Sequence, residues 1–232
     1  MSRNQKKATI QLFEEELFEE EKYRAATTHY PSPISPDKPQ MSDEEKISCI
    51  AENFRQIMEV LGLDLNDDSL SKTPYRIAKM YVKEIFSGLD VDQFPTFTFM
   101  ENRYKHKDRS NMVFVTAQFT SFCEHHFVPM CGTAYVAYLP NQKLIGLSKI
   151  PRLVKYFAKR PQVQERLTIQ IADSLSNLLE TEDVAVSITA QHFCVVARGI
   201  ENQNSTTTTH VFQGGFREND LLREEFFESV KR

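Results

Sequence analysis

The segment "MVFVTAQFTSFCEHHFVPMCGTAYVAYL", Met112 to Leu139, contains the pattern that decides the fold. Its two arms, "MVFVTAQF" and "TAYVAYL", follow a period of two and are rich in Val, Tyr, Phe and Thr, which predicts strands. A third stretch of this kind, "VAVSITAQHFCVVA", spans residues 184–197. We therefore expect hairpin strands in this half of the chain.

Helical patterns surround these strands. "SDEE" at Ser42 is a capping box, and it predicts a helix that ends at Gly62. "KTPYR" predicts a second helix with Thr73 as N-cap and Pro74 at the first helical position. Three further helices are expected in "SKIPRLVKYFAKR", "PQVQERLTIQIADSLSNLLE" and "ENDLLREEFFESVKR". Helices first, then strands with a helix pair inserted, favour an α+β fold with an antiparallel sheet.

Composition narrows the class of protein. Hydrophobic residues make up 41% of the 232 residues, enough for a core, and the net charge of −4 gives no reason to expect nucleic acid as a partner. No run of eighteen apolar residues is present, so we expect no membrane association. Four cysteines without a secretory signal predict a cytoplasmic location in a reducing compartment.

The N-terminal residues differ from the rest. "FEEELFEEEKY" is acidic and "YPSPISPDKPQ" contains four prolines, so residues 1–41 are predicted to form a flexible acidic and Pro-rich tail. Residues 42–232 are predicted to form the folded domain, with N-terminal helices in 42–90 and the α+β part in 91–232. His29 in the tail and His106 in a charged loop are expected to be solvated.

A metal site is predicted by thiols and imidazoles at short spacing. Cys123 and His126 are three residues apart, so a turn brings both side chains to one point. His192 and Cys194 would project from the same face of a strand. Zinc suits this mixture of ligands, and three protein ligands leave a fourth position for water. Spacing alone leaves Cys131 as an alternative to Cys194.

Five motifs, in order, make the chain resemble one family closely. "CEHHF", "GLSKIPRLV", "RPQVQERLT", "QHFCVVARGI" and "STTTTHVFQGGF" resemble GTP cyclohydrolase I, from about Ser42 to the C-terminal helix. The resemblance implies a zinc-dependent enzyme that hydrolyses GTP at C8 and releases formate. Ring closure then gives 7,8-dihydroneopterin triphosphate, the first step of folate or pterin biosynthesis.

The resemblance also assigns roles to single residues. It places the Zn2+ ligands at Cys123, His126 and Cys194, and it makes His125 and His192 the catalytic acid and base. His192 would protonate the purine N7, with His125 assisting later proton transfers.

Substrate binding is implied in the same way. Glu165 would accept from the guanine N1–H and amino group, with Gln164 beside it, although a glutamate at this position of a helix is usually just solvated. The triphosphate would lie against cations and a hydroxyl, namely Ser148, Lys149, Arg152, Arg198 and, from a neighbouring subunit, Arg76 and Lys79. The polar face of an amphipathic helix explains Arg76 and Lys79 almost as well.

Finally, the resemblance implies an assembly. Antiparallel four-stranded sheets with helices on one face, the tunnelling fold, would join into a barrel, and two pentameric rings would form a homodecamer with intersubunit active sites. The alternative is a catalytically inactive, zinc-stabilised assembly that binds a nucleotide. The sequence identifies no regulatory partner.

Overall fold

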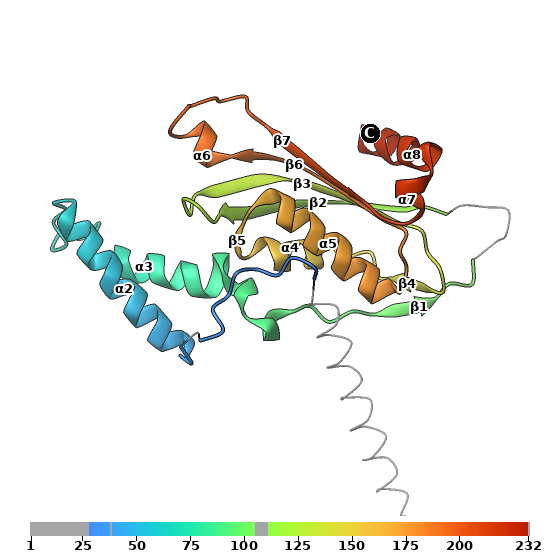
Figure 1. Cartoon of the computed structure of the whole chain (residues 1–232). Coiled ribbons are helices and arrows are strands. Elements are labelled where there is room, and N and C mark those ends of the chain that lie inside the picture. The colour runs from blue at the N-terminus through green and yellow to red at the C-terminus, as the bar shows by residue number, and fades with distance from the viewer. Residues whose placement is uncertain (1–27, 38, 105–110, 232) are drawn as a thin grey trace, which may run out of the picture.

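An antiparallel sheet lies at the centre of the computed structural model, which describes residues 28–37, 39–104 and 111–231 (Figure 1). The strands run in the order β5-β2-β3-β6-β7. Their bounds are β2 Val113–Cys123, β3 Pro129–Tyr138, β5 Pro161–Gln162, β6 Val184–His192 and β7 Thr207–Phe212. Only the two-residue β5 pairs in parallel, with β2. The predicted α+β class with an antiparallel sheet is confirmed, although the period-two patterns did not predict β7.

Two further strands form a separate small sheet. β1 (Phe99–Glu101) and β4 (Lys143–Ile145) pair antiparallel. The backbone N–H of Ile145 donates to the Tyr138 hydroxyl at 3.4 Å, which joins β4 to the end of β3.

The main core lies between the sheet and two helices, α4 (Lys149–Ala158) and α5 (Gln164–Leu179). Both helices cover the same face of the sheet (Figure 1). Val136 and Ile188 face these helices and pack with Leu153, Leu167 and Leu175, all fully buried. Burial of each such side chain stabilises the fold by roughly 1.5–3 kcal/mol.

The opposite face of the sheet carries the C-terminal helices, α7 (Gly215–Glu218) and α8 (Asp220–Val230) (Figure 1). Ala137 and Ala185 are small, and they leave room on this face for the fully buried rings of Phe216 and Phe226. The expectation of helices on one face is therefore wrong. The strands are apolar on both faces at this end of the sheet, and each face is covered by its own helices.

The N-terminal helices form a separate pair. α2 (Asp43–Val60) begins with the predicted capping box, in which Ser42 N–H donates to Glu45 Oε2 at 2.7 Å. α3 (Thr73–Met80) already includes Thr73, and its N-cap is Lys72, which makes no side-chain capping bond, so the predicted N-cap is wrong by one residue. A π-helical turn, η1 (Tyr81–Ile85), continues α3, and two 3₁₀ turns follow, η2 (Ser87–Leu89) and η3 (Val91–Gln93).

The described part of the N-terminal segment lies against α5. His29 donates from its backbone N–H to the buried Asp173 carboxylate at 3.0 Å, and Tyr30 O accepts from Gln170 at 2.8 Å. The His29 ring is 82% exposed, yet its Nδ1 lies 2.9 Å from Asp173. His106 and residues 1–27 lie outside the described residues. Within the described residues, no helix has the length and apolar character needed to cross a membrane.

Candidate metal centre

The first half of the candidate centre is the tight turn that follows β2. Phe127 N–H donates to Cys123 O at 2.8 Å, and Cys123 N–H donates to Val128 O at 2.9 Å. Phe127 has a φ of 52°, a left-handed conformation that few residues other than glycine adopt. The closed turn brings side chains three positions apart together, and Cys123 Sγ lies 3.9 Å from His126 Nδ1.

The second half lies where β6 ends. β6 pairs with β3 until Met130 faces His192, which places the end of β6 beside the turn. Phe193–Val196 then form the short helix α6, so the expectation that His192 and Cys194 share one face of a strand is wrong. The residue opposite Phe193 would be Pro129, which has no backbone N–H to extend the ladder. Cys194 reaches the centre from α6.

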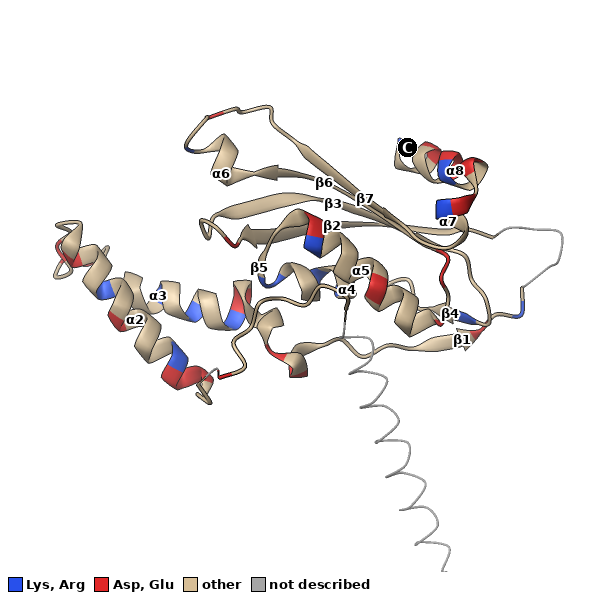
Figure 2. Ribbon diagram, in the orientation of Figure 1, with Lys and Arg blue, Asp and Glu red and all other residues tan. Residues whose placement is uncertain are grey.

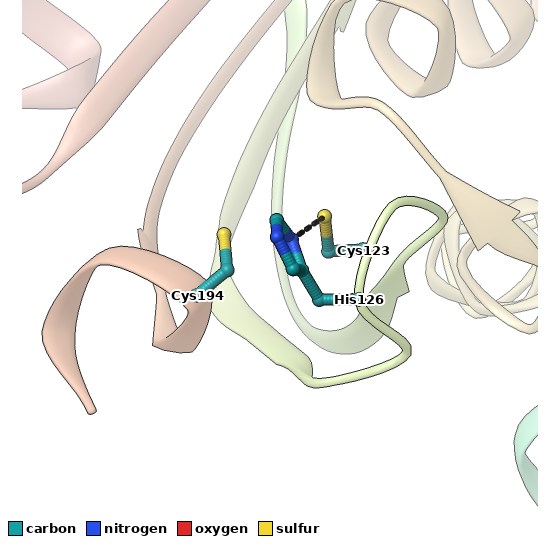
Figure 3. A group of neighbouring side chains, drawn as sticks. All are labelled: Cys123, His126 and Cys194. Atoms are coloured by element: carbon teal, nitrogen blue, oxygen red, sulfur yellow. Dashed lines mark hydrogen bonds between the residues drawn. The ribbon is translucent and has the colours of Figure 1, made fainter. Parts of the chain in front are cut away.

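Cys123, His126 and Cys194 bring their ligand atoms within 4.8 Å of one another (Figure 3). Cys123 is buried and His126 is exposed, so the group is open to solvent on one side. Two thiols and one imidazole form a donor set typical of zinc, and the open side leaves a fourth position. Cys131 lies outside this group, with its Sγ 3.7 Å from Thr120 Oγ1.

Burial and neighbouring polar groups act on the ligand atoms. Burial, and then the neighbouring Cys123, raise the pKa of the Cys194 thiol above its ordinary value. A bound divalent cation favours thiolates and would remove this cost. Arg198 Nη1 donates to His126 Nε2 at 3.2 Å. Because a guanidinium can only donate, this nitrogen of His126 presents its lone pair.

His192 is held by Gln164, the first residue of α5. Gln164 is 1% exposed, and its Nε2 donates to the backbone oxygens of Ile188 and Thr207, both at 3.0 Å. These carbonyls fix the orientation of the amide, so Oε1 accepts from His192 Nε2 at 2.7 Å. Neutral His192 therefore carries its proton on Nε2 and offers Nδ1. Burial lowers the pKa of His192, and the charge of Glu165 opposes this shift.

His125 has different surroundings from its neighbour. Its side chain is 65% exposed, and its Nε2 lies 3.9 Å from Glu124 Oε1. Its Nδ1 lies 3.9 Å from Cys123 Sγ. His125 thus stands at the edge of the metal group, and its catalytic role stays a prediction.

The residues predicted to bind substrate fall into two sets. One set lies close to the metal group and comprises Glu165, Gln164 and Arg198. Gln164 contacts His192, and the charge of Glu165 opposes the lowering of the His192 pKa by burial. Arg198 contacts His126. The amide of Gln164 is already occupied within the chain, so a contact with guanine stays a prediction.

The second set lies on other helices. Ser148, Lys149 and Arg152 are at the start of α4, and Arg76 and Lys79 are exposed on α3. Basic residues lie along both α3 and α4 (Figure 2). No hydrogen bond or ion pair among the described residues joins this set to the metal group. A helix of ten residues is roughly 15 Å long, and α4 separates Lys149 from Pro161, which pairs with Phe122 beside Cys123.

Two residues that the sequence analysis did not single out, Gln162 and Arg166, contact Glu124. The only signal in the sequence was Glu124 itself, a carboxylate inside the thiol–imidazole cluster with no assigned role. Its partner lies 42 positions away, a distance that no local pattern can bridge.

Comparisons with known proteins show which family the chain resembles. A model of the family "GTP cyclohydrolase I" matches residues 50–231. The proteins named GTP cyclohydrolase 1 from Salmonella arizonae and Salmonella paratyphi B are each 50% identical to this chain over 200 residues, which is 86% of this chain and 89% of theirs. The solved structure of the apo archaeosine synthase QueF-Like aligns with 45% of this chain and 95% of its own, at 14% identity and a TM-score of 0.36, values from which no function is inferred.

Proposed function

The chain belongs to the GTP cyclohydrolase I family, a family of hydrolases, and on this premise we propose that it opens the guanine imidazole ring of GTP at C8. Formate is released, and ring closure gives 7,8-dihydroneopterin triphosphate. One observation carries the proposal. Cys123, His126 and Cys194 converge from two distant segments, and His192 lies two residues before Cys194 at the end of β6.

The metal ligands and histidines divide the chemistry. Cys123, His126 and Cys194 would hold zinc, which supplies a Lewis acid and lowers the pKa of a bound water to about 7. His192, fixed through Nε2 by Gln164, would act as an imidazolium: it gives the proton on Nδ1 to the purine N7 and returns to the neutral form protonated on Nε2. Its lowered pKa makes the imidazolium a readier donor.

Recognition of GTP uses the remaining charges. Glu165, exposed on the first turn of α5, accepts from the guanine N1–H and amino group. Arg198, Lys149 and Arg152 bind the triphosphate, with Ser148, Arg76 and Lys79 in support. Guanidinium groups suit phosphate oxygens because their donors match in pairs.

We also propose that copies of the chain assemble with sites between subunits. The C-terminal end of α2 carries exposed apolar side chains: Ile57 is 51% exposed, Val60 87% and Leu61 70%. A neighbouring copy would cover this apolar surface. β7 is an edge strand of the described sheet, and pairing with another copy would satisfy its free backbone groups. Five such sheets would close into a ring, and two rings would form a decamer of two pentamers.

Turnover of GTP by the zinc-loaded protein tests the proposed function. Formate and the pterin product should appear in equal amounts. Formate without pterin would place only the ring opening in this chain. Neither product, with the metal bound, would favour an assembly that binds a nucleotide without converting it.

A further inference from the structure

We propose that Glu124 and Arg166 are positioning residues, which fix the Cys123–Phe127 turn and orient His125 for the reaction. The inference rests on the proposed function. It concerns the one charged residue of the "CEHH" cluster that neither holds the metal nor moves a proton in the account above.

Glu124 lies between an anchored cation and His125. One carboxylate oxygen, Oε2, accepts from Arg166 Nη2. The other, Oε1, lies 3.9 Å from His125 Nε2. The Glu124 side chain is 24% exposed and that of His125 65% exposed. Glu124 is therefore a fixed charged group that can orient the mostly solvated imidazole of His125.

Arg166 is itself anchored in the helix–sheet junction. Its side chain is 13% exposed. Nε donates to Gln162 Oε1 at 3.1 Å, and Nη2 donates to Pro161 O at 3.2 Å. The planar guanidinium is thus held at two points besides Glu124, a fork that lysine cannot reproduce.

Gln162 ties this fork to the core. It is 1% exposed, and its Nε2 donates to Phe157 O at 2.8 Å and to Gln170 Oε1 at 2.9 Å. The same residue accepts at its backbone oxygen from Glu124 N–H at 3.0 Å. The turn is therefore attached to β5 and α5 twice, once through the Glu124 backbone and once through its side chain.

This attachment matters because the turn holds two metal ligands and His125. The turn leaves the sheet at Cys123, and the backbone bond from Phe127 N–H to Cys123 O closes it. Without the Glu124–Arg166 pair, the turn would keep that closure but lose its side-chain tether to α5. A partly buried guanidinium would also lose its anion. Partners of this kind behind a metal site typically change affinity or activity about 10- to 100-fold.

The test uses Glu124→Gln, Arg166→Met, the double variant and Arg166→Lys in the full-length oligomer. We expect kcat to fall about 10- to 100-fold with an unchanged KM for GTP. The double variant should lose no more than the stronger single variant, because the two residues act through one contact. Arg166→Lys should not retain the wild-type kcat.

A readout independent of turnover is the visible spectrum of the Co2+-substituted protein. Cys123 and His126 belong to the tethered turn, so the variants should shift this spectrum at full metal loading. Lys143→Met is the matched control. It removes the 2.9 Å ion pair between Lys143 and Glu180, which lies at the other end of α5. Both kcat and the spectrum should stay as in the wild type.

Two results would overturn the positioning role. One is a wild-type kcat and spectrum in both single variants. The other is a raised KM with unchanged kcat in Arg166→Met, which would make Arg166 a binding residue beside Glu165. If the wild-type protein forms no formate from GTP, the proposed function fails instead, and the Co2+ spectrum still decides whether the pair positions the turn.

Discussion

Neighbouring residues in the turn after β2 have different surroundings. His126 joins two thiols within 4.8 Å, whereas His125 is largely solvated beside Glu124. His192 is distinct from both, since a buried amide fixes its tautomer. The contacts of each residue therefore suit a different proposed role: metal ligand, proton carrier or positioning residue.

Cys194→Ser should lose bound zinc and turnover together, because a hydroxyl is a poor replacement for a thiolate at a zinc site. The matched control is Cys131→Ser, which should keep both, since Cys131 lies outside the metal group. Metal content by atomic absorption and formate release check the pair. Normal zinc in Cys194→Ser, with loss in Cys131→Ser, would show that the ligand set is wrong.

His192→Ala should keep zinc and the oligomer but lower kcat by about 10²- to 10⁴-fold, the range of general acid catalysis. His29→Ala serves as control, because its ring is 82% exposed and contacts Asp173 instead of the metal group. Full activity in His192→Ala would contradict the proton-transfer role.

Among the elements, sequence patterns predicted those that are periodic and missed those fixed by tertiary pairing. The α2 capping box and the strands β2 and β3 follow from local residue order. The end of β6 does not, because it depends on Pro129 in the facing strand. β7 consists largely of threonines without an apolar alternation, and its pairing with β6 makes it a strand.

The same division holds for the candidate site. The spacing of Cys123 and His126 predicted one half of it. Cys131 and Cys194 remained equivalent by spacing, and the arrangement of β3 and α6 separates them. The Glu124–Arg166 contact joins segments that only the folded chain brings together.

The segment before α2 gives a prediction about stability. His29 and Ser32 provide partners for the buried Asp173 and Arg160. A chain that begins at Asp37 should be less stable than one that begins at Thr28, by about 1–3 kcal/mol for the lost partners of buried groups. The difference in Tm between the two zinc-loaded proteins measures it. Equal Tm values would mean that the segment does not contribute to stability.

For the whole molecule, the proposed site is spread over surfaces that lie apart within one copy of the chain. The metal group lies at one end of the sheet, and Lys149 and Arg152 lie at the start of α4 with no described hydrogen bond or ion pair to it. Exposed apolar residues on α2 and the edge strand β7 offer surfaces for neighbours. A complete site would then combine residues of different subunits.

Mixed oligomers test this sharing. Cys194→Ser and Arg152→Ala chains should each be nearly inactive alone. Co-expressed in equal amounts, they should recover about a quarter of wild-type activity, because random assembly joins an intact Cys194 from one chain with an intact Arg152 from another at that frequency. No recovery, in oligomers shown to contain both chains, would place both residues of a site in one subunit.

The central claim is that the metal at Cys123, His126 and Cys194 enables hydrolysis of GTP. The most direct test titrates zinc into metal-stripped protein and follows formate released from GTP. Formate production should be absent at first, rise in proportion to bound zinc and level off at one zinc per chain. Production that does not respond to zinc, or none at full loading, would contradict the account.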